Sequence, residues 1–194
     1  MNNAIRSILF MLSLCITSTG VVQAAECKFA HNSVDKITKT RVVITKWVQL
    51  THWFREERRE MTAFVSAGND DGDQTLRIRI EYVRDVATAA KKESGGSAMS
   101  IPQGTELMIA MSDGSLVKLP ASLGIVGSTD YVESMSDWLV TKAEIDYHLD
   151  AAVAAELMAQ SAKAIRVVTD NGHYDVRIHK SNVDDIRRAI ECVQ

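Results

Sequence analysis

The sequence is poor in cysteine, and it lacks the short motifs that mark most enzymes and metal proteins. Its 194 residues include three cysteines, with no Cys-x-x-Cys pair, no His-Glu-x-x-His and no Gly-x-Ser-x-Gly. A phosphate-binding loop and a dinucleotide-binding fingerprint are also absent. These absences disfavour redox catalysis, a zinc site of known spacing and nucleotide-dependent chemistry, and we expect no cofactor. They leave open a catalytic set that is assembled only on folding.

The sequence also lacks a block of charge of one sign. It holds 22 Lys and Arg against 25 Asp and Glu, for a net charge of −3, and opposite charges alternate along the chain. Because binding to phosphates needs a concentrated basic surface, nucleic acid is not an expected partner. The apolar fraction of 46% is ordinary for a globular protein with its own core.

The first 24 residues have the order of a secretory signal peptide. Arg6 precedes an apolar run over 8–16, and small and polar residues then lead to a Val-Gln-Ala sequence that ends at Ala24. We expect cleavage after Ala24, so that 1–24 is removed together with Cys15. The apolar run is shorter than the roughly 20 residues of a spanning helix, so no transmembrane segment is expected after cleavage. The expected location is periplasmic or secreted.

Cleavage leaves two cysteines, Cys27 and Cys192, near opposite ends of the chain. Two cysteines of a chain in an oxidising compartment usually pair, so we predict a disulfide that joins the last helix to the first strand. Two buried free thiols are the alternative. A redox pair is disfavoured because the two residues are not in the close spacing that lowers a thiol pKa.

β-Branched residues predict a strand over 41–50, with Val42, Ile44, Val48 and Leu50 on one side. Further strands are expected at 60–67 and 137–147.

Residues 74–83 alternate most clearly. The apolar face of this predicted strand consists of Leu76, Ile78, Ile80 and Tyr82. The opposite face consists of Arg77, Arg79 and Glu81, which we expect to meet water. The acidic residues of 68–74 are expected to form the turn before this strand.

An Asn-Gly pair at positions 171 and 172 predicts a tight hairpin over 165–178. With those two residues as the turn, Thr169 opposes Tyr174 and Arg166 opposes Arg177. The apolar residues of both strands then share one face.

A second hairpin is predicted over 106–119, with Asp113 and Gly114 at its turn. Residues 87–104 have no periodicity and concentrate Gly, Ser and Lys, so we expect a mobile surface loop there.

Two helices are expected in the C-terminal third. Asp150 can cap a helix over 151–163, and Ser181, followed by Asp184, can cap one over 182–193. The residues expected to face inward are Val153, Leu157, Val183, Ile186, Ile190 and Val193. The predicted fold is α+β, mainly an antiparallel sheet or sandwich with two C-terminal helices and one disulfide, and 25–194 forms a single domain.

One strand face of the last hairpin carries His173, Asp175, Arg177 and His179. Imidazole and carboxylate groups are usual metal ligands, which makes His173, Asp175 and His179 weak candidates for a metal site. Arg177 stands between two of them, and a cation among the ligands opposes a second cation. We therefore favour a solvated face and predict no metal.

The stretch from His52 to Glu60 combines two aromatic residues with charges of both signs. Trp53, Phe54 and Arg55 are the candidates for binding a partner, because aromatic and arginine side chains are enriched at interfaces. The alternative is that Trp47 and Trp53 pack in the core.

The preferred hypothesis is a periplasmic or secreted, non-enzymatic module that binds a protein of the cell envelope, with sheet edges as docking places. An exported hydrolase that uses His52, His173 and Asp175 is one alternative. A structural component of the envelope is another. The oligomeric state is not predicted.

Overall fold

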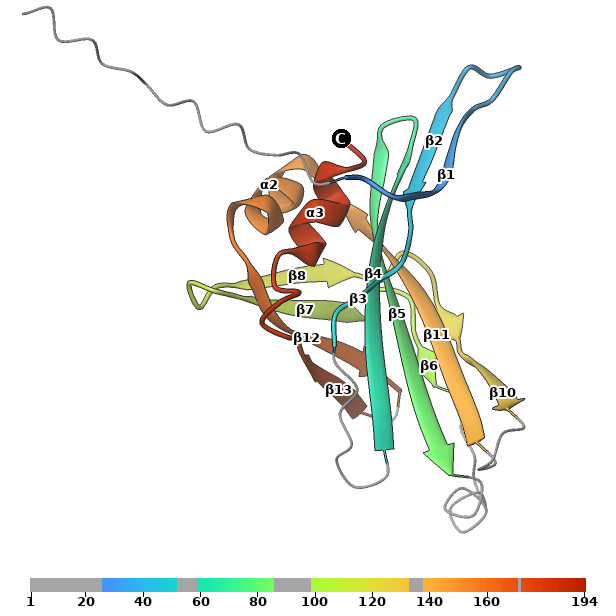
Figure 1. Ribbon diagram of the computed structural model, residues 1–194, viewed down its shortest axis with the longest axis vertical. Coiled ribbons are helices and arrows are strands. Elements are labelled where there is room, and N and C mark those ends of the chain that lie inside the picture. The colour runs from blue at the N-terminus through green and yellow to red at the C-terminus, as the bar shows by residue number, and fades with distance from the viewer. Residues whose placement is uncertain (1–25, 52–58, 86–98, 133–137, 171) are drawn as a thin grey trace, which may run out of the picture.

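The computed structural model describes residues 26–51, 59–85, 99–132, 138–170 and 172–194 (Figure 1). These residues form antiparallel sheets and two helices, both helices lying in the last third of the chain. The predicted α+β class, dominated by antiparallel sheet, is confirmed.

The large sheet has the strand order β1-β2-β4-β5-β11-β10, with β3 along β4. Its strands are β1 (Phe29–Val34), β2 (Arg41–Thr45), β3 (Val48–Gln49), β4 (Arg59–Asp70), β5 (Asp73–Asp85), β10 (Ser128–Val132) and β11 (Trp138–Leu149). The turn between β4 and β5 is the predicted acidic one, at Asp71 and Gly72, both of which have positive φ.

A four-stranded sheet has the order β13-β12-β7-β8, and β6 pairs with β9. Their bounds are β6 (Ser100–Ile101), β7 (Glu106–Met111), β8 (Leu116–Pro120), β9 (Ile125–Val126), β12 (Ala162–Thr169) and β13 (Gly172–Arg177). In Figure 1, β7 and β8 run crosswise to the long strands β4, β5 and β11. The expected loop 87–104 is described only from residue 99, where Met99 and Ile101 are buried and Ser100–Ile101 forms β6.

One cluster of buried residues joins both sheets and both helices. The predicted alternation of β5 is confirmed, because Leu76, Ile78 and Ile80 are fully buried in this cluster. Tyr82 packs against it. The inner face of the large sheet is therefore core, as its hydrophobic period indicated.

The predicted strand 41–50 is wrong in part, because it breaks at Lys46 and Trp47. Val43, rather than Val42 or Ile44, is buried in β2, and Val48 in β3 is 40% exposed. The break changes the phase of the strand, so apolar residues two apart in the sequence no longer share a side.

The two predicted hairpins form, one of them in a different register. Asp113 and Gly114 make the turn between β7 and β8, with Asp113 Oδ1 accepting from Ser115 N at 2.9 Å. In the last hairpin, Thr169 lies opposite Gly172, not Tyr174, since Gly172 already belongs to β13. The strands are thus offset by two residues, which keeps the predicted inward face.

The first predicted helix forms as α2 (Ala151–Ala159), and its cap is confirmed, because Asp150 Oδ1 accepts from Val153 N at 2.8 Å. Leu157 is buried as expected. The chain turns to strand β12 at Ala162, so the helix is shorter than predicted.

The second helix, α3 (Asp185–Glu191), begins three residues later than predicted, after Asp184. Ser181 does not cap it, because its hydroxyl lies 2.7 Å from His179 Nδ1 and donates to Asn182 Oδ1. Tertiary contacts hold the preceding residues outside the helix, since Asn182 Nδ2 donates to the carbonyl of Gln49. Ile186, Ile190 and Val193 are buried as expected.

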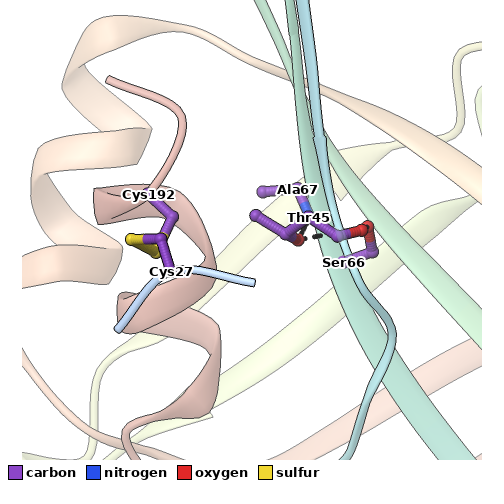
Figure 2. The surroundings of a disulfide bond; sticks show 5 residues. All are labelled: Cys27, Thr45, Ser66, Ala67 and Cys192. Carbon is purple, nitrogen blue, oxygen red and sulfur yellow. Dashed lines mark hydrogen bonds between the residues drawn. A yellow bond between two sulfur atoms is a disulfide. The ribbon is translucent and has the colours of Figure 1, made fainter. Parts of the chain in front are cut away.

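The predicted disulfide is present. Cys27 Sγ and Cys192 Sγ are 2.05 Å apart and the Cα atoms 5.6 Å. Cys192 lies at the C-terminal end of α3, and Cys27 lies two residues before β1, so the bond joins the last helix to the chain just before the first strand (Figure 2). Neither α2 nor α3 is long and apolar enough to cross a membrane.

Candidate partner-binding surface

The predicted partner-binding residues Trp53, Phe54 and Arg55 lie outside the described residues, as does His52. Their role stays a prediction. Three surfaces of the described residues bear on binding: the outer face of the large sheet, the outer face of the last hairpin, and the free edge of β1.

The outer face of the large sheet carries Trp47, which the alternative hypothesis placed in the core. Trp47 is instead half-buried against two arginines of β5, with the guanidinium carbon of Arg79 at 4.9 Å and that of Arg77 at 5.2 Å from its ring centroid. Arg79 also lies 4.2 Å from the ring of Phe64. The arginines expected to meet water are thus only about a fifth exposed (23% and 21%).

Acidic side chains balance the charges of these arginines. Arg77 Nε is 2.9 Å from Asp146 Oδ1, and Arg79 Nε is 3.1 Å from Glu81 Oε1. Glu144 lies 3.8 Å from both arginines. Because rings and carboxylates already engage both guanidinium groups, this cluster covers the sheet and leaves little unused capacity for a ligand.

The last hairpin does not present a metal site in the described residues. Arg166 lies opposite Asp175 and donates to both of its oxygens, at 2.5 and 2.7 Å. These hydrogen bonds hold the pKa of Asp175 below its usual value. His173 Nε2 is 3.7 Å from Asp175 Oδ2, whereas His179 Nδ1 contacts Ser181. No group of three or more potential ligands occurs within the described ranges.

Zinc is therefore expected to leave the melting temperature of the protein unchanged. A metal at Asp175 has to displace the bidentate guanidinium of Arg166, and a ligand raises Tm only when it binds the folded state. Thermal unfolding with and without zinc measures this. A zinc-dependent rise in Tm that His173→Ala abolishes would contradict the expectation.

A cavity of about 180 Å³ lies beside the disulfide. It is lined by Arg41, Val43, Asn69, Asp71, Gly72, Cys192, Val193 and Gln194. The Asn69 side chain is used within the fold, because it donates to the carbonyl of Val193 and accepts from Gly72 N. The hydrolase candidates His173 and Asp175 do not line this cavity.

The free edge of β1 is different, and sequence analysis missed this strand because residues 29–34 show no hydrophobic alternation. β1 ends the large sheet, and every residue from Ala30 to Val34 is exposed. The β1–β2 hairpin projects past the body of the sheet (Figure 1). At the other end of the sheet, β10 leads into residues outside the described part.

Hydrogen bonds define which backbone groups of β1 point outward. The carbonyl of Arg41 accepts from Asp71 N on the β4 side, so Arg41 and its partner Val34 form a non-hydrogen-bonded pair. Alternation along the antiparallel pair then directs the N–H and C=O of Val34 and Asn32 away from β2. No strand of the described residues takes these groups.

Side-chain hydrogen bonds fix the base of this hairpin to the sheet. The buried Thr45 accepts from Ala67 N at 2.9 Å through its hydroxyl, and its carbonyl accepts from the hydroxyl of Ser66 at 2.8 Å (Figure 2). The disulfide holds the chain just before β1. The edge strand is thus anchored at its base while its outward groups stay accessible.

Of these three surfaces, the β1 edge retains unused backbone groups, whereas the other two engage their charged groups internally. Comparison of the chain with protein-family models, with curated proteins and with solved structures found no match.

Proposed function

We propose that the protein is an exported, non-enzymatic module that binds a protein of the cell envelope, and that it docks through the open edge of β1. The observation that carries the proposal is this edge, with the outward N–H and C=O groups of Asn32 and Val34. An exposed edge is a template for strand addition, in which main-chain hydrogen bonds supply affinity.

Two further features support export. Residues 1–24 have the order of a signal peptide. The Cys27–Cys192 disulfide fits an oxidising compartment, because cytosolic thiols are kept reduced. The hydrolase alternative gains no support from the described residues, since Asp175 is engaged by Arg166 on an exposed strand face.

The substitution Asn32→Pro is expected to reduce capture of the partner by about tenfold or more while the protein stays folded. Proline removes one outward donor and blocks close approach of a strand, yet it is tolerated on an edge whose N–H faces solvent. The measurement is in-cell crosslinking followed by purification of the exported protein from the envelope fraction.

Two variants control for side chain and direction. Asn32→Ala keeps the backbone donor and is expected to keep the partner. Ser33→Pro removes a donor on the β2 side and is expected to destabilise the protein more than Asn32→Pro. Equal partner capture by Asn32→Pro and the unmodified protein, with folding intact in both, would refute docking at β1. Firm retention in the wall or membrane fraction without a dominant crosslinked protein would favour the structural-component alternative.

A further inference from the structure

The β1–β2 hairpin is the basic part of an acidic protein. Residues 26–46 hold five Lys and Arg against two Asp and Glu, a net charge of +3, whereas the whole chain has a net charge of −3. From this contrast we infer that the partner adds to β1 with an extended acidic segment. The inference rests on the proposed function and specifies the chemistry of the partner.

The basic charges of the hairpin are available to a ligand. The five side chains are Lys28, Lys36, Lys39, Arg41 and Lys46, and all are exposed. Ion pairs occur elsewhere in the described residues, but none involves these five. Lys39 donates to the carbonyl of Lys36, which leaves its charge uncompensated.

The acidic residue at the turn is committed to the hairpin itself. Asp35 Oδ1 accepts from Ile37 N and Thr38 N, both at 2.7 Å. The carboxylate therefore shapes the turn and faces its own backbone. An incoming strand meets mainly the lysines and the arginine.

These cations lie at both ends of the docking edge. Lys28 precedes β1, the turn beyond Val34 holds Lys36 and Lys39, and Arg41 lies directly opposite Val34. A six-residue strand spans about 20 Å, so a segment along β1 has a cation within about one Debye length of each end. The exposed side chains of Val34 (55%) and Ile37 (90%) add apolar contact area.

A second copy of the chain fits this edge less well than an acidic segment. Two hairpins of net charge +3 repel when their edges approach, and like charges across an interface oppose pairing. Lysines at an edge can also serve only to prevent such self-association. Guarding the edge and attracting an acidic strand make different predictions for charge removal.

The test uses the exported full-length product and two labelled peptides of about eight residues, the length that covers β1. The peptides are identical in their Val and Thr positions and carry Glu in one and Lys in the other at alternate positions. We expect the Glu peptide to bind about tenfold tighter than the Lys peptide at low salt, with a smaller difference at high salt. Fluorescence anisotropy measures both affinities.

Charge removal localises the effect. The triple variant Lys36→Gln, Lys39→Gln, Arg41→Gln is expected to weaken Glu-peptide binding about tenfold. The matched control is Lys163→Gln, Arg177→Gln, Lys180→Gln, which removes three exposed cations at the other sheet and is expected to bind the peptide normally.

Three results overturn the inference. Equal binding of the two peptides removes the preference for acid. Self-association of the triple variant in sedimentation, with Glu-peptide binding unchanged, assigns the lysines to edge protection. Capture by vesicles containing anionic phospholipid, with neither peptide bound, assigns the basic hairpin to a membrane surface. If Asn32→Pro loses the crosslinked envelope partner while the triple variant keeps it, docking at β1 stands and the acidic partner fails.

Discussion

Replacing Cys27 and Cys192 together by serine is expected to lower the free energy of unfolding by about 5 kcal/mol and Tm by roughly 10 to 20 °C. The two residues are separated by 165 positions, so the disulfide closes a loop that includes nearly the whole described chain. In the chain-entropy account, opening so long a loop returns a large conformational entropy to the unfolded state. Residual structure in the unfolded chain lowers the effect, which makes this figure an upper value.

The folded state should change little, because other contacts hold α3 in place. Ile186 and Ile190 of α3 are buried, and Val193 accepts a hydrogen bond from Asn69. Denaturant unfolding of the double-serine variant measures the loss, and the unmodified protein under reducing conditions should give the same value. A loss below about 1 kcal/mol, with an unchanged denaturant slope, would contradict the entropic account.

Features set by short stretches of sequence could be predicted. The buried face of β5 follows from strict alternation, and the turn at Asp113 and Gly114 follows from local turn chemistry. The cap of α2 by Asp150 needs only the adjacent turn of helix. The disulfide followed from the number of cysteines and the expected compartment.

Features set by distant contacts could not be predicted. The start of α3 depends on Asn182, whose side chain bonds to Gln49, 133 positions earlier in the chain. The last hairpin differs from the predicted register because a one-residue change in the turn moves the opposing strand by two residues and preserves its inward face. Hydrophobic pattern cannot separate two such registers.

The same limit applies to the candidate site. The ion pair of Arg166 with Asp175 follows from the observed register, and the predicted register placed Arg166 opposite Arg177 instead. β1 lacks a buried face, so it has no hydrophobic period to detect. Its position at the edge depends on the order of strands, which local sequence does not encode.

Truncation of Ile78 is the second large effect that we expect. Ile78→Ala should lower the free energy of unfolding by about 2 to 5 kcal/mol. Ile78 lies in β5, between Val65 of β4 and Ile145 of β11, and all three side chains are fully buried. The loss combines the transfer of fewer apolar atoms out of water with a cavity that central strands, hydrogen-bonded on both sides, cannot readily close.

A graded series distinguishes core packing from a general loss of hydrophobic residues. Ile78→Val removes one methylene and should cost about 0.5 to 1.5 kcal/mol. Leu116→Ala, at a side chain that is 51% exposed in β8, should cost no more than about 0.5 kcal/mol. Urea unfolding monitored by circular dichroism gives all three values. Equal losses for Ile78→Ala and Leu116→Ala would mean that the inner face of the large sheet is not the core, and the anchoring of β1 to a rigid sheet would lose its basis.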